Sequence, residues 1–69
     1  MPYASAYDVL KSATATVAEC ANAIEELGIQ YGYITAVVAL GVRENADIDL
    51  VRIKVLIKAL KFKIVKLSK

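Results

Sequence analysis

The chain has 69 residues but no histidine, no tryptophan, one cysteine, one proline and three glycines. Because histidine is the usual general base at neutral pH, its absence leaves no nucleophile–base pair to propose. The single cysteine, Cys20, rules out an internal disulfide, and without histidine it cannot form a zinc-binding cluster. Its place among apolar residues is typical of a small buried hydrophobic side chain. We therefore expect no enzyme activity, no metal and no cofactor.

Acidic residues are missing from the last part of the chain. Residues 50–69 contain seven basic residues and no acidic one, whereas residues 1–42 contain four acidic residues and only one basic. A charge asymmetry of this kind indicates a nucleic acid or another anionic surface as partner.

Hydrophobic residues, by contrast, make up 58% of the chain, above the usual ~45–50%. A chain this short buries only a modest core, and oligomerisation is a common way for such chains to cover the remaining apolar surface. The longest uncharged run, residues 27–42, is shorter than the ~20 apolar residues that a membrane-spanning helix needs. We therefore expect self-association, and a membrane span is the less favoured alternative.

Apolar residues near the C-terminus recur at alternating intervals of three and four. This spacing predicts a helix over about 47–67 that packs lengthwise on another helix. Asp47 and Asp49 suit its positive end, and Asn45 or Asp47 can cap it. We call the repeat the core seam: Leu50, Ile53, Ile57, Leu60, Ile64 and Leu67.

A similar repeat runs from Leu10 to Gly41 without a change of phase, which predicts one long helix over about 5–42. Ser5 and Asp8 resemble a capping box at its start. Gly28 and Gly32 lie inside it, spaced so that they let another helix approach closely. In the alternative, Gly28 ends the helix and three helices result.

Residues 43–47 interrupt the apolar pattern and predict a turn, which makes an all-α hairpin with one long and one shorter helix. The shorter helix covers only about half of the longer one, so the surface near Leu10, Val17 and Ile24 needs another molecule. If different patches meet between copies, the contact propagates into a ring or a filament. The predicted subunit-packing residues are Leu10, Val17, Ile24, Gly28, Gly32, Leu50, Ile53, Ile57, Leu60, Ile64 and Leu67.

The basic residues of the second helix lie on both sides of the core seam, and a second apolar face containing Val51, Val55, Phe62 and Val65 separates the two groups. Three interpretations are open: solvated lysines, a membrane-surface helix, or lysines that neutralise phosphates. We favour the third, without base reading, because lysine is a point charge and few aromatics are present. The candidates are Lys54, Lys58, Lys61, Lys63 and Lys66.

An Ala/Ser/Thr-rich segment (5–26), an apolar middle (31–42) and a lysine-rich C-terminal helix follow one another along the chain. This order resembles the small all-helical major coat proteins of filamentous viruses, the inoviruses, whose basic tail faces the packaged genome. Inovirus coats are single helices, so the predicted turn is closer to the hairpin coats of some rod-shaped archaeal viruses. The resemblance implies a capsid subunit in a virion, with many copies around nucleic acid. The alternatives are a pilus or other extracellular filament subunit without nucleic acid, and a membrane-surface or coiled-coil interaction protein.

Overall fold

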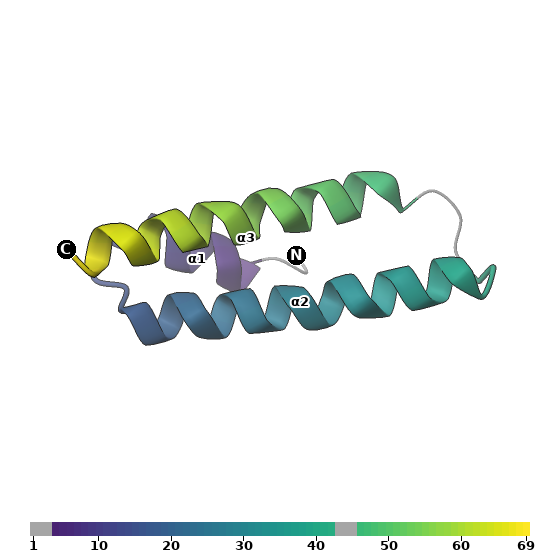
Figure 1. Ribbon diagram of the computed structural model, residues 1–69, viewed down its shortest axis with the longest axis horizontal. Coiled ribbons are helices and arrows are strands. Elements are labelled where there is room, and N and C mark those ends of the chain that lie inside the picture. Colours follow the sequence, from purple (N-terminus) through teal and green to yellow (C-terminus); the bar gives the residue numbers. More distant parts are fainter. Residues whose placement is uncertain (1–3, 43–45) are drawn as a thin grey trace.

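The computed structural model describes residues 4–42 and 46–69, and in this part of the chain it contains three α-helices and no strand. They are α1 (Ala4–Lys11), α2 (Val17–Ala39) and α3 (Asp47–Leu67). The two long helices run antiparallel side by side, as Figure 1 shows. The expected all-helical class is confirmed, whereas the expected single long helix over 5–42 is wrong.

The helical path breaks between α1 and α2, where three hydroxyl residues alternate with alanines. Ser12 Oγ accepts a hydrogen bond from the backbone N–H of Thr14 at 3.2 Å. Side chains that bond to nearby backbone in this way compete with the helical hydrogen-bond ladder. The apolar repeat keeps its phase through this segment, so periodicity alone missed the break.

A capping box then starts α2 at Thr16. Thr16 Oγ1 accepts from the backbone N–H of Glu19 at 3.2 Å, and Glu19 Oε1 accepts from the N–H of Thr16 at 3.1 Å. Together they satisfy two backbone donors that a helix start leaves free. Ser5, the expected cap, instead lies inside the first turn of α1.

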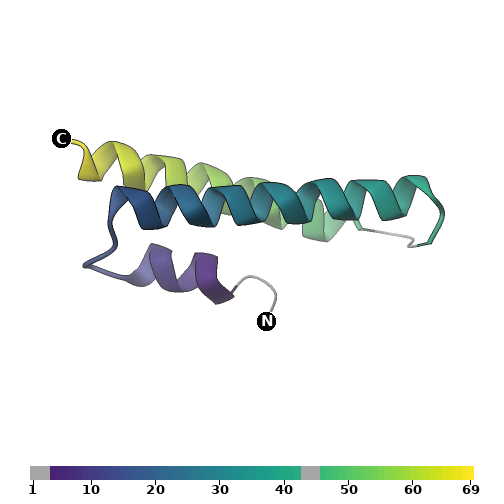
Figure 2. The same cartoon turned by 90° about the horizontal axis from the view of Figure 1, so that it is seen from below.

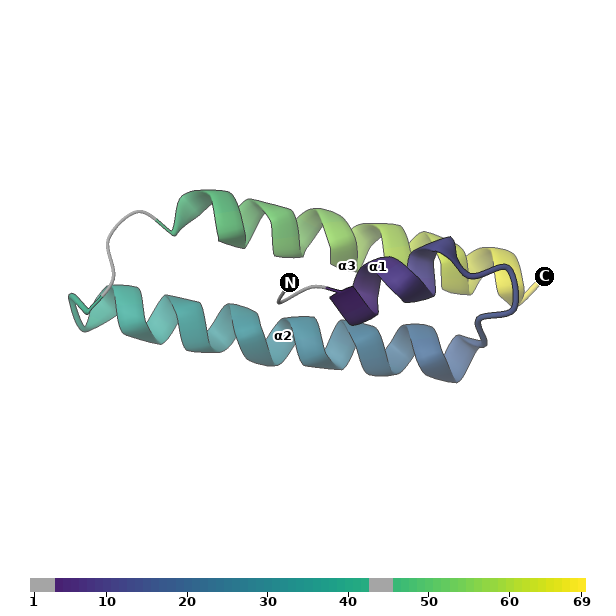
Figure 3. The same ribbon diagram turned by 180° about the vertical axis from the view of Figure 1, so that it is seen from behind.

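The break lets α1 fold back against both long helices (Figures 2 and 3). Ala6 is buried there, and Leu10 packs against the core, as does Ile24 of α2. The expectation that Leu10 and Ile24 stay uncovered is therefore wrong. A third helix from the same chain covers the part of α2 that a two-helix hairpin leaves bare.

The second helix passes through Gly28 and Gly32 without interruption, as expected, so the alternative in which Gly28 ends the helix is wrong. It ends at Ala39, three residues before the expected end. Gly41 has a φ of 73°, and its N–H donates to the carbonyl of Val38 while the N–H of Val42 donates to that of Val37. This is a Schellman motif, which needs a left-handed residue that glycine supplies at little cost.

The bounds of α3 agree with the expected helix over 47–67. Its N-cap is Ala46, which makes no side-chain capping hydrogen bond, and Asp47 is the first helical residue rather than the cap. Asn45 and most of the predicted turn lie outside the described residues. Asp47 and Asp49 lie in the first turn and Lys66 in the last, where each complements the helix dipole.

The core is made within one chain, between the three helices. Cys20 and Ile53 have no exposed surface, which confirms that the cysteine serves as a packing residue. The buried residues that form this core are Ala6, Cys20, Ala23, Leu27, Ile34, Ala46, Ile53, Leu56 and Leu60.

Candidate interaction surface on the third helix

The core seam of α3 faces its own chain. Ile53 and Leu60 are fully buried, and Leu50, Ile57 and Ile64 pack against the core. Leu67, in the last turn, stays 43% exposed. These side chains were expected to pack between subunits, but the structure uses most of them to close the monomer. The surface left for another molecule is on the opposite side of the helix.

That opposite side carries a second row of large apolar side chains, which we call the outer stripe. Residues three or four apart share a helix face, and Lys58 occupies the one position where the row is interrupted. The expected second apolar face of this helix is thus present, with one further member at its start. The outer stripe consists of Ile48, Val51, Val55, Phe62 and Val65, which are 53–67% exposed.

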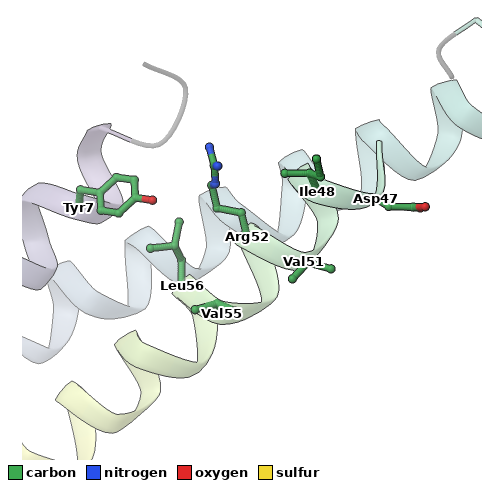
Figure 4. A pocket seen from close by; sticks show the side chains of 7 residues that line it. All are labelled: Tyr7, Asp47, Ile48, Val51, Arg52, Val55 and Leu56. Atoms are coloured by element: carbon green, nitrogen blue, oxygen red, sulfur yellow. The ribbon is translucent and has the colours of Figure 1, made fainter. Parts of the chain in front are cut away.

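Open hollows border the outer stripe where α1 approaches α3. One, of about 490 Å³, is mostly apolar, and Figure 4 shows Tyr7 reaching toward it from α1. Its lining residues are Tyr7, Asp47, Ile48, Val51, Arg52, Val55 and Leu56. A second, of about 380 Å³, lies between the two helices near Leu10 and Phe62. The outer side of α3 is therefore an uneven apolar surface that side chains of a partner can fill.

Basic residues flank the outer stripe on both sides, and they differ in their surroundings. Lys54, Lys58 and Lys61 are exposed and form what we call the lysine row. The Nζ of Lys54 lies over the ring of Tyr31 in α2, 5.6 Å from its centroid, a cation–π contact. On the other flank Arg52 and Lys66 are exposed.

Lys63 has a different role from the one expected. Its Nζ donates hydrogen bonds to the carbonyls of Val9, Leu10 and Ser12 at 2.8, 2.9 and 2.7 Å. The last carbonyls of a helix have no partner within it, so the ammonium group caps the end of α1. All three of its N–H groups are used in this way, and we remove Lys63 from the phosphate-binding candidates.

The lysine row lies on the far side of α3 from this cap. Each residue turns a helix by about 100°, so Lys54, nine positions before Lys63, points in nearly the opposite direction. No sequence signal separated Lys63 from the row. It looks like any other lysine of the helix, and its partners are more than fifty residues away in the chain.

The outward side of α2 carries mostly small residues, together with Glu25. Gly28 and Gly32 are exposed, and a Cβ built at either would meet nothing within 4 Å. The expected close approach of a helix to these glycines is thus not made within the chain. Val17 is 41% exposed at the start of the helix. Two exposed residues of this outward face, Ile29 and Tyr33, are large and apolar, 67% and 69% exposed. The exposed members of the face are Ala18, Ala21, Asn22, Glu25, Gly28, Ile29, Gly32, Tyr33, Thr35, Ala36 and Ala39.

Two further features bear on the kinds of site the structure can hold. Among residues 4–42 and 46–69, no group of three or more metal-ligating side chains is gathered. Within the same residues, no helix has both the length and the apolarity needed to cross a membrane.

A scan against protein-family models, a search of curated proteins and a search of solved structures each found no match.

Proposed function

We propose that the protein is a structural subunit that assembles with further copies of itself through the outer stripe of α3. The observation behind this proposal is the exposure of five large apolar side chains on one face of a chain that already has a closed core. Extended apolar patches on soluble proteins mark interaction surfaces. The intervals of three and four are those of helices that pack lengthwise, so a helix is the partner element that suits the stripe.

A substitution in the middle of the stripe tests this function. Val55→Gln keeps a helix-compatible residue at an exposed position, so the fold should persist, while apolar contact with a neighbour is lost. We expect sedimentation velocity to show concentration-dependent assembly of the wild type and a several-fold weaker assembly of the variant. Val42→Gln is the matched control, because Val42 is at least as exposed but lies outside the stripe. A wild type that remains a 7.5 kDa species at millimolar concentration would contradict the proposal.

We further propose, from the resemblance to viral coats, that such an assembly packages nucleic acid. The lysine row supports this role, because Lys54, Lys58 and Lys61 are exposed on one side of α3, away from α1. Lysines neutralise phosphates regardless of base sequence, and the binding weakens as salt rises. In this proposal the protein belongs in a virion, with the lysine row toward the genome.

The test of packaging is a comparison of two triple variants that lose the same charge. Replacing Lys54, Lys58 and Lys61 by Gln should weaken binding to duplex DNA and to RNA and flatten its salt dependence. Replacing Lys11, Arg52 and Lys69 by Gln removes three exposed charges outside the phosphate-binding candidates and should have a smaller effect. Equal effects would assign the binding to net charge. Assemblies without excess 260 nm absorbance would instead favour a filament without nucleic acid, such as a pilus.

A further inference from the structure

The outer stripe needs an occupant, and the charges around it restrict the choice. Arg52, Lys54, Lys58, Lys61 and Lys66 are all exposed beside it. If the stripe met the stripe of another copy, these five cations would be brought against five more. Like charges placed together across an interface oppose association. Pairing of α3 with α3 is therefore disfavoured.

The outward face of α2 has the opposite charge. Glu25 is exposed there, and Glu19 and Glu26 are exposed on the flank of α2 that borders α1. The segment from Val17 to Ala39 contains no basic residue. The carboxylates of α2 in one copy would attract the cations beside the outer stripe of the next, and such complementarity favours this encounter over the pairing of two α3 helices.

The shapes of the two faces match as well. The outer stripe projects branched and aromatic side chains, whereas the outward face of α2 has glycine and alanine around Gly28 and Gly32, with Ile29 and Tyr33 along one edge. Helix axes approach more closely when the side chains at the contact are small. At about 1.5 Å per residue, the stripe from Ile48 to Val65 is roughly 26 Å long and the face from Ala18 to Ala39 roughly 32 Å, so the two overlap along nearly their full length.

Resting on the proposed self-assembly, we infer that the outer stripe of α3 in one copy packs on the outward face of α2 in the next. The two faces differ and point away from each other across the core, so each copy contacts two neighbours. A contact between unlike surfaces is heterologous and continues into a ring or an open filament rather than stopping at a dimer. Glu25 of one copy then lies near lysines that flank the stripe of the next.

Cysteine crosslinking distinguishes this arrangement from the alternatives. In a Cys20→Ala background, Gly28→Cys places a thiol on the face of α2 and Val55→Cys places one on the outer stripe. With a short flexible bismaleimide, the chain carrying both thiols should give a ladder of multimers. A mixture of the two single variants should give dimers that neither gives alone. Ala21→Cys and Val51→Cys provide a second exposed pair, and circular dichroism checks that each variant remains helical.

Three other outcomes of the crosslinking experiment would overturn the inference, each for a different reason. Dimers from Val55→Cys alone, as abundant as those from the mixture, would show that the stripe meets itself, and self-assembly would stand without the heterologous contact. If no variant crosslinks and light scattering gives the monomer mass, the proposed assembly fails too. If the Val55→Cys thiol is protected from maleimide only when phosphatidylglycerol vesicles or duplex DNA are added, the occupant is that surface and not a second copy.

Discussion

At the scale of single residues, Lys63 shows how one side chain joins distant parts of a small chain. Its ammonium group lies at the end of α1 and bonds three carbonyls. Hydrogen bonds that involve a charged group are shorter and stronger than neutral ones. Because α1 is only eight residues long, it is too short to be stable as an isolated helix in water. Its position therefore depends on this cap and on the burial of Ala6.

Removing the ammonium group should loosen α1. We expect Lys63→Met to lower the free energy of unfolding by about 1–3 kcal/mol, since three carbonyls lose a charged donor. Lys61→Met is the matched control, because Lys61 is exposed and lies on the opposite side of α3 from Lys63. It should change stability by less than about 0.5 kcal/mol. Urea denaturation measures both, and equal stabilities of the two variants would show that the cap contributes little.

At the scale of elements, the three glycines differ in what they do for the second helix. Gly28 and Gly32 lie within α2 with open space where a Cβ would be, whereas Gly41 lies beyond its end with a φ of 73°. The first two impose the entropic cost of glycine in a helix. The third adopts the left-handed conformation that ends the helix, which costs other L-residues roughly 1–2 kcal/mol.

Alanine substitutions should therefore have opposite effects on α2. Gly28→Ala and Gly32→Ala should each raise the free energy of unfolding by roughly 0.5–1 kcal/mol. Gly41→Ala should lower it by about 1 kcal/mol. The measurement is thermal or urea unfolding at a concentration where the chain is monomeric. A loss of stability in Gly28→Ala would mean that the outward face of α2 is covered within the monomer, contrary to the structure.

At the scale of the whole molecule, three helices close one core and leave the outer side of α3 apolar. The core seam looks uniform in sequence, but its members differ in burial. Leu60 is fully buried under the packed helices, whereas Leu67 is 43% exposed at the end of α3. Because the core closes within one chain, similar apolar residues of the core seam contribute unequally to the stability of the fold.

The same substitution at these two leucines should separate them. Leu60→Ala should lower the free energy of unfolding by about 2–5 kcal/mol, because it removes buried methyl groups and leaves a cavity. Leu67→Ala should lower it by less than about 1 kcal/mol. Since small domains are only marginally stable, Leu60→Ala is expected to unfold well below the wild type in a thermal melt. Similar melting temperatures for both variants would contradict the single-chain core.

The sequence by itself determined the helical class, the bounds of α3, the passage of α2 through Gly28 and Gly32 and the two apolar faces of α3. These features follow from local rules, namely the helical repeat and helix-dipole preferences, which act within a few turns. The break at residues 12–16 also has a local sequence signal, the Thr16–Glu19 capping box. The unbroken apolar repeat on both sides nevertheless favoured one continuous helix. A short exception of this kind is easily missed when the periodic pattern on either side is strong.

Only the tertiary structure decided which apolar face of α3 is inside and which lysine is not free. The core seam and the outer stripe have the same spacing, so the pattern alone could not say that α1 and α2 cover one and leave the other exposed. Lys63 resembles its neighbours until the fold brings the end of α1 to it. Both outcomes depend on contacts between residues far apart in the chain, and such contacts are fixed by how the helices pack together rather than by local preference.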